Sequence, residues 1–131
     1  MDLTETALRL LRAPSTCYIA TTMPDGSPQL TQVWVDTDGT DVVINTVAGF
    51  QKLRNVDRDP RVSVAVADPG DPTQYLQIRG EVVETTQEGA REHIDRLSQK
   101  YTGHDYVPYG GSEQQRVIVR IAPRRISGTA R

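Results

Sequence analysis

The sequence has few of the features that would connect it to a membrane, a nucleic acid or an oxidising compartment. Its 131 residues include a single cysteine, Cys17, which is expected to be a small buried hydrophobe without a disulfide partner in the chain. No run approaches the ~20 apolar residues of a membrane span, and the first residues lack the basic and apolar segments of a signal peptide. The 15 basic and 17 acidic side chains include no basic block, which argues against nucleic acid. We therefore expect a cytoplasmic protein with no membrane or nucleic-acid partner.

Signatures of several enzyme classes are also missing. The sequence has no Gly-x-Ser-x-Gly, Walker or Rossmann fingerprint, which disfavours hydrolases, nucleotide triphosphatases and classical dehydrogenases. His93 and His104 have no paired carboxylate or cysteine at ligand spacing, so both are interpreted as surface histidines and no metal site is expected. No catalytic residue can be assigned from the sequence.

The residues that are present indicate one small β-rich domain over 1–131. Hydrophobic residues make up 37% and charged residues 24%, which is typical of a globular chain of single-domain length. Asp25-Gly26 predicts a hairpin, so the first half reads as a three-stranded meander, and Gly80 is expected to mark a bulge or bend. Alternation of apolar and polar residues predicts strands over 16–22, 29–36, 41–46, 61–67, 74–86 and 116–121.

Three helices are expected beside these strands. Asp2 is expected to cap the first, with Glu5 as its capping-box partner. A short second helix precedes Asp59-Pro60, and a third, amphipathic helix covers 87–100. The glycine-rich and aromatic segment 103–112 is either a lid or a connection. So many strands in a short chain leave exposed edges unless the sheet closes, which favours an antiparallel barrel covered by helices.

One stretch has the pattern of an anion site. A predicted strand ends at Asn45-Thr46, and Gly49 to Lys52 open the next helix. Backbone amides at a helix amino terminus, a threonine hydroxyl before it and a lysine in its first turn can converge on a phosphate. The same spacing fits a turn capped by Thr46 beside a solvated Lys52, and spacing alone slightly favours that plainer interpretation.

Around this stretch the sequence resembles a known family. The relevant strings are Gln-Val-Trp-Val-Asp-Thr-Asp-Gly from 32, Val-Val-Ile-Asn-Thr from 42 and Gly-Phe-Gln-Lys-Leu-Arg-Asn-Val-Asp-Arg-Asp-Pro-Arg-Val-Ser-Val from 49. They resemble the pyridoxamine 5'-phosphate oxidase-like split barrels, and more narrowly the flavin/deazaflavin-dependent oxidoreductases that often bind coenzyme F-420. The resemblance implies a mainly β fold, a split barrel of about six to seven antiparallel strands with about three peripheral helices.

The resemblance also implies a cofactor site at a homodimer interface. Residues 33–35 are expected against the isoalloxazine-type ring, 44–46 along the ring edge and its side chain, and Lys52 at the phosphate. Gln77 and Arg79 are expected to come from the same or the partner subunit. Cofactor contacts are thus implied for Val33, Trp34, Val35, Ile44, Asn45, Thr46, Lys52, Asn55, Gln77 and Arg79.

Two features depart from the family pattern. Many relatives have Gly-Arg-x-Lys, whereas Phe50 stands at the position of that arginine here. This implies weaker phosphate binding or compensation by Arg54 or Arg58. The carboxy-terminal arginine-histidine motif of the family's substrate site is not recognisable over 116–131, so oxidation of pyridoxamine phosphate itself is not expected.

The implied function is that of an oxidoreductase in which the cofactor carries the hydride and the protein supplies binding and orientation. The expected cofactor is F-420, and the expected acceptor is an unsaturated or quinone-like small molecule bound near Trp34 and residues 101–109. FMN is the alternative cofactor. The sequence is also compatible with a non-catalytic carrier of flavin or haem, and with a barrel that has lost its ligand.

Overall fold

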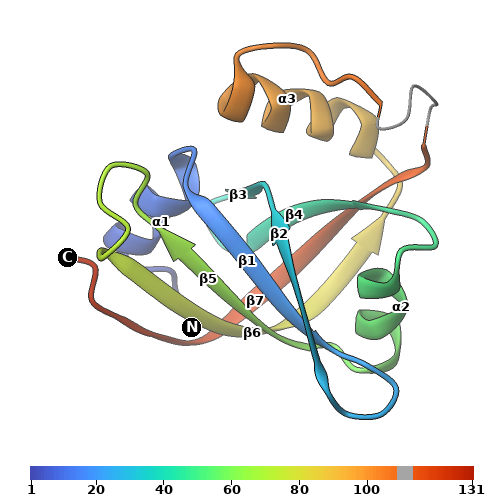
Figure 1. Cartoon of the computed structure of the whole chain (residues 1–131), viewed down its shortest axis with the longest axis horizontal. Helices are drawn as coiled ribbons and strands as arrows, with labels where there is room; N and C mark the ends of the chain where they lie inside the picture. The colour runs from blue at the N-terminus through green and yellow to red at the C-terminus, as the bar shows by residue number, and fades with distance from the viewer. Residues whose placement is uncertain (109–113) are drawn as a thin grey trace.

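The structure, a computed structural model, describes residues 1–108 and 114–131. Within these residues one sheet of seven antiparallel strands is accompanied by three helices (Figure 1). The predicted mainly β fold is confirmed. The elements are α1 (Glu5–Arg12), β1 (Thr16–Thr22), β2 (Pro28–Val33), β3 (Val35–Thr37), β4 (Val42–Val47), α2 (Gln51–Arg58), β5 (Arg61–Ala67), β6 (Tyr75–Thr86), α3 (Ala90–Thr102) and β7 (Arg116–Gly128).

The sheet is curled into a half-barrel. We call the junction at Trp34, where the chain passes from one edge strand of the sheet to the other, the seam. Its strand order is β2-β1-β5-β6-β7-β4-β3, so β2 and β3 lie at opposite ends of the order although only Trp34 separates them in the chain. The predicted strand 29–36 is therefore broken at Trp34. Its first part pairs with β1 and its last part with β4, so the predicted meander exists with a divided middle strand.

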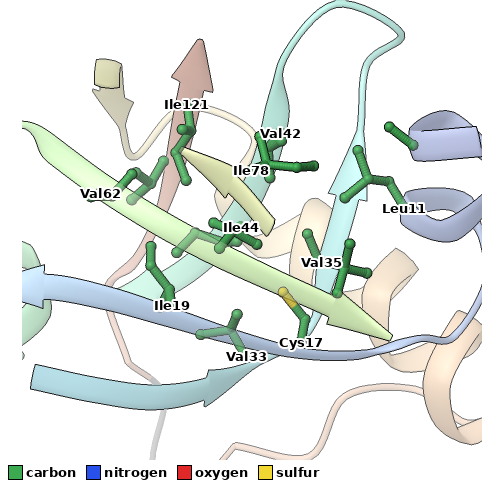
Figure 2. Packing of buried hydrophobic residues seen from close by; sticks show 14 of the residues in the cluster. Leu11, Cys17, Ile19, Val33, Val35, Val42, Ile44, Val62, Ile78 and Ile121 are labelled. Carbon is green, nitrogen blue, oxygen red and sulfur yellow. The ribbon is translucent and has the colours of Figure 1, made fainter. Parts of the chain in front are cut away.

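The core fills the concave side of this half-barrel. Alternate residues of β1 and β5 are buried, as expected for strands with one face inward. Figure 2 shows Ile19, Ile44, Ile78 and Ile121 converging from four different strands, with Cys17 beside them. Cys17 is fully buried, as predicted, and burial raises the pKa of its thiol to about 12.

β4 is buried on both faces, and α3 explains why. All six of its residues are buried, which a strand exposed on one side does not allow. One face belongs to the main core, and on the other Val43 forms a second apolar cluster with Ala90 and Ile118. Figure 1 shows α3 at the end of the molecule opposite the tip of the β1–β2 hairpin. No helix among the described residues has the length and apolar character needed to cross a membrane.

The start of α1 and the end of the last strand differ from the sequence prediction. The cap of α1 is Thr4 and not Asp2, because the Thr4 hydroxyl accepts the Ala7 N–H at 3.1 Å while buried Leu3 packs into the core just before it. β7 runs well beyond 121, because its charged second half still pairs with β6. The register between β6 and β7 shifts next to Gly80, which confirms the predicted bulge.

Candidate cofactor-binding site

A cavity of about 740 Å³ lies where α3 faces the seam of the half-barrel. The start of β1, the break between β2 and β3, the end of β4, the start of α2 and one side of α3 all contribute to its wall. No aspartate or glutamate occurs among the described residues of this wall. The lining residues are Pro14, Ser15, Thr16, Cys17, Gln32, Val33, Trp34, Asn45, Thr46, Phe50, Lys52, Ile94, Leu97, Tyr101, Tyr106, Gln114 and Arg116.

An aromatic pair forms one part of the wall. The rings of Trp34 and Tyr101 stack with their centroids 5.4 Å apart and their planes 10° from parallel. The Tyr101 hydroxyl donates to the Ser15 carbonyl at 2.7 Å and accepts the Val35 N–H at 3.2 Å. It thereby links the backbone just before β1 to the first residue of β3. Burial raises the pKa of Tyr101 to about 12, so the hydroxyl stays protonated at neutral pH.

Lys100 anchors the same end of α3. Its ammonium donates to the carbonyls of Leu11 at 2.6 Å and Val35 at 2.5 Å, and it lies 3.9 Å from the Asp36 carboxylate. Burial lowers the pKa of Lys100, whereas Asp36 acts in the opposite direction. Lys100 and Tyr101 together fix α3 to the seam, so this wall of the cavity is held by tertiary contacts.

Thr46 and Lys52, the side chains of the predicted anion site, line the same cavity. Lys52, in the first turn of α2, is half-buried and has no hydrogen-bond or ionic partner among the described residues. Burial lowers its pKa, and Arg116 lowers it further. The Thr46 hydroxyl is buried without a partner in the described parts of the chain, and no side chain there caps α2. The cap that the plainer interpretation requires is therefore absent among the described residues, whereas its solvated Lys52 is only partly borne out, because Lys52 is half-buried.

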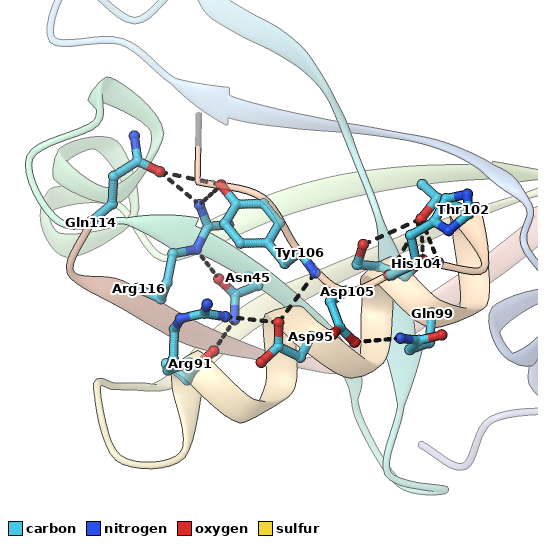
Figure 3. A network of polar contacts seen from close by, with 12 residues as sticks. Asn45, Arg91, Asp95, Gln99, Thr102, His104, Asp105, Tyr106, Gln114 and Arg116 are labelled. Atoms are coloured by element: carbon cyan, nitrogen blue, oxygen red, sulfur yellow. Dashed lines mark hydrogen bonds and ion pairs between the residues drawn. The ribbon is translucent and has the colours of Figure 1, made fainter. Parts of the chain in front are cut away.

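Asn45 connects the cavity to α3. Its Nδ2 group donates to the Ala90 carbonyl at 2.9 Å and to His93 Nδ1 at 3.0 Å. Its Oδ1 atom accepts the Nε–H of Arg116 at 2.7 Å (Figure 3). Every polar atom of the Asn45 side chain is thus used, which fixes the orientation of the amide.

Arg116 is the first residue of β7, and the groups that contact its guanidinium are neutral. Its Nη1 lies 3.3 Å from the Tyr106 hydroxyl and 3.4 Å from Gln114 Oε1, and its guanidinium lies 5.2 Å from the centroid of the Tyr106 ring (Figure 3). Burial lowers the pKa of Arg116, but a guanidinium remains charged at neutral pH. A cation therefore faces the cavity without a carboxylate among the described residues.

The prediction that His93 is a surface residue is wrong. His93 is only 4% exposed, and burial, reinforced by Arg96, lowers its pKa to about 4. The signal was available, since His93 lies three residues after Ala90 and four before Leu97, on the stripe that faces the sheet. His104, in contrast, is exposed as predicted.

The structure brings half of the sequence-predicted contacts to this cavity. Those that line it are Val33, Trp34, Asn45, Thr46 and Lys52. The side chains of Val35 and Ile44 lie in the core instead. The pocket loop predicted over 101–109 contributes Tyr101 and Tyr106, while residue 109 lies outside the described residues.

Asn55 lies away from the cavity in its own chain. It is fully buried, and its amide donates to Thr21 Oγ1 at 3.0 Å and Gln29 Oε1 at 3.2 Å, which joins α2 to the β1–β2 hairpin. Gln77 and Arg79 are exposed on the outward face of β6 and do not line the cavity either.

The arginines expected to compensate for Phe50 are bound elsewhere. Arg54 donates to the Gly49 carbonyl at 2.5 Å, and Arg58 donates to the Thr22 carbonyl. Neither lines the cavity, whereas Phe50 does. Arg116, which sequence reasoning missed, is the arginine that does line it.

Comparisons with known proteins match this fold over nearly the whole chain. Residues 3–130 match the family described as pyridoxamine 5'-phosphate oxidase. A solved F-420 reductase is 28% identical with a TM-score of 0.83, over 95% of this chain and 98% of that one. A conserved hypothetical protein from Mycobacterium tuberculosis is also 28% identical, with a TM-score of 0.72 over 95% and 82% of the two chains. HupZ from Group A Streptococcus, 20% identical with a TM-score of 0.67 over 95% and 91%, shares the fold. No curated protein gives a significant match.

Proposed function

Because the chain belongs to the pyridoxamine 5'-phosphate oxidase family, we propose that it is an oxidoreductase that binds the deazaflavin coenzyme F-420 in this cavity. The observation that carries the proposal is the combination, in one cavity, of a stacked aromatic wall with a lysine and a threonine hydroxyl that are unpaired among the described residues. The likeness to an F-420 reductase along almost the full length of both chains supports the choice of cofactor. FMN is the alternative, since its phosphate would use the same groups.

The residues of the cavity fit such a cofactor. Lys52 supplies a positive charge and Thr46 a hydroxyl donor for the phosphate, and Trp34 supplies a rigid aromatic surface beside the ring. Ile94 and Leu97 of α3 contribute apolar surface that excludes water. When bound, the reduced deazaflavin supplies a hydride to an unsaturated or quinone-like acceptor.

The described wall offers binding and orientation, with little acid–base chemistry. It contains no aspartate or glutamate, and the Tyr101 hydroxyl already donates to the Ser15 carbonyl and accepts the Val35 N–H. Tyr101 therefore acts by holding α3 and Trp34 in place. We assign no catalytic residue to the chain.

Gln77 and Arg79 fit this proposal as contributions from a second copy. Both alternate outward on β6 and are exposed, so they cannot reach the cavity of their own chain. A homodimer with the cofactor site at its interface would bring them to the partner's cavity. The site of each chain is then completed by the other.

The proposal is tested by titrating the protein with F-420 and, separately, with FMN. Trp34 is the only tryptophan of the sequence and lies in the wall, so its fluorescence reports occupancy directly. We expect saturable quenching that is tighter for F-420, and about tenfold weaker binding in Lys52→Met through loss of the charged contact. Arg54→Gln, on the same helix but outside the cavity, is the matched control and should bind like the native protein.

Turnover separates an enzyme from a carrier. With reduced F-420 and a quinone acceptor, an oxidoreductase consumes the reduced cofactor, whereas a carrier binds it without net oxidation. Binding without turnover by any tested acceptor favours the carrier. Absence of quenching by both cofactors removes the proposed function and leaves the fold.

A further inference from the structure

Arg116 has the properties of a ligand-binding residue. It lines the cavity, and its Nε is committed to Asn45 while its Nη1 lies near the neutral oxygens of Tyr106 and Gln114. Among the described residues nothing pairs with its Nη2 group. The guanidinium thus keeps donors that a ligand in the cavity can use.

The charges around Arg116 point to an anion. Lys52 and Arg116 line the same cavity, are close enough for Arg116 to lower the pKa of Lys52, and have no carboxylate partner within the described parts of the chain. Arg120, on the same strand, shows the ordinary arrangement, because it pairs with Asp38 at 2.8 Å and Glu84 at 2.9 Å. Two half-buried cations with no counter-charge among the described residues repel each other and lose hydration, and an anion between them offsets both costs.

The position of Arg116 is fixed before any ligand arrives. Asn45 holds its Nε, and the amide of Asn45 is itself held by the Ala90 carbonyl and His93 Nδ1. A planar guanidinium fixed in this way loses little side-chain entropy when it binds a phosphoryl group. The Thr46 hydroxyl, which has no partner in the described chain, adds a further donor in the same cavity.

We propose that Arg116 is a second phosphate-binding residue of the cavity, positioned by Asn45, and that it acts together with Lys52 on one phosphoryl group. It fills the role for which Arg54 and Arg58 are wrongly placed. The identity of the cofactor rests on the proposed function, whereas the recognition of a phosphoryl group by Arg116 does not.

The test uses FMN and riboflavin, which differ only in the phosphate. For Arg116→Gln we expect about tenfold weaker binding of FMN and unchanged binding of riboflavin. Arg120→Gln, the matched arginine of the same strand, should change neither affinity. Equal losses for both ligands, or no loss for FMN, would overturn the proposal. Arg116→Lys keeps the charge but not the bond to Asn45, and should fall between the two proteins.

A calorimetric titration of the same proteins with inorganic pyrophosphate separates the two proposals. If neither flavin nor F-420 binds the native protein, the proposed function fails, but pyrophosphate binding that Arg116→Gln weakens still supports the role of Arg116. If the native protein binds neither pyrophosphate nor FMN, the phosphate site is overturned. Near-ultraviolet circular dichroism of each variant confirms that its fold is retained.

Discussion

At the scale of single residues, the Asn45 amide ties the protonation of a buried histidine to the placement of Arg116. Both Nδ2 protons are used, on the Ala90 carbonyl and on His93 Nδ1, so only Oδ1 can face the Arg116 Nε–H. If the amide were reversed, the Asn45 NH2 group would face the Arg116 Nε–H, and two donors would oppose each other. The arrangement therefore requires a neutral His93 whose Nδ1 accepts and whose Nε2 carries the proton.

This requirement makes the fold sensitive to acid. The pKa of His93 is lowered from 6.5 to about 4, so between these values the unfolded chain binds a proton that the folded chain does not. Stability is therefore lost as the pH falls from about 6.5 to about 4. Asparagine can accept the same hydrogen bond without titrating, so His93→Asn should remove roughly 2 kcal/mol of this loss.

Urea unfolding at about pH 7 and about pH 4.5 measures the difference between these proteins. His104→Asn, which replaces an exposed histidine, is the control and should behave like the native chain. An equal acid-induced loss in native protein and His93→Asn would show that His93 does not titrate in this window.

The positions of residues were predictable where the signal is local. Thr46 and Lys52 lie on either side of one strand-to-helix turn, so the sequence already places them close to each other, and both line the cavity. Arg116 contacts Asn45 only because β7 pairs with β4, and no local pattern contains that pairing. The burial of His93 could have been read from the apolar stripe of α3, but its partner Asn45 could not.

At the scale of elements, the close pairing of β6 with β7 depends on Gly80. A Cβ atom there would lie 2.5 Å from the Ala122 carbonyl oxygen and 2.7 Å from Ile121, so backbone would have to move. We expect Gly80→Ala to lower the free energy of unfolding by roughly 1–3 kcal/mol through this overpacking. Gly70→Ala, where the nearest atom is 3.4 Å away on a surface side chain, should stay within about 0.5 kcal/mol. Urea unfolding compares the two, and equal losses would contradict the steric argument.

Element boundaries followed the sequence where alternation is strict. The predicted bounds of β1 and β5 match the structure, because each strand alternates between core and outside along its whole length. The predicted last strand ends too early, at 121, because Arg124 and Arg125 follow Pro123 and break the apolar pattern. Backbone pairing of β7 with β6 nevertheless continues past them. The division of the strand at Trp34 has no local signal, since it arises from a change of pairing partner.

At the scale of the whole molecule, an acidic chain encloses a cationic cavity. The formal charge is -2, yet the described wall carries Lys52 and Arg116 and no carboxylate. The overall charge therefore gives no hint of the ligand. The fold itself was predictable from the number of strands that need closure and from the resemblance of 32–64, whereas the order of the strands emerges only when the sheet is assembled.

A shared site in a homodimer predicts complementation between two defective chains. Lys52 lines the cavity of its own chain, whereas Arg79 lies on the outward face of β6 and would serve the partner's cavity. Lys52→Met and Arg79→Ala should each weaken F-420 binding in the homodimer. In a heterodimer of the two, one site carries both substitutions and the other carries neither, so about half of the sites should recover native affinity.

Co-expression with two different affinity tags isolates this heterodimer, and Trp34 fluorescence measures the number of native-affinity sites. Arg124→Ala, which removes an exposed arginine of β7, is the control and should keep native affinity at every site. Recovery of no sites would place both groups in one chain's site, and full binding by Arg79→Ala alone would remove Arg79 from the site. A chain that runs as a monomer in size-exclusion chromatography while it binds F-420 with native affinity would refute the shared site, because each cavity would then be complete without a partner.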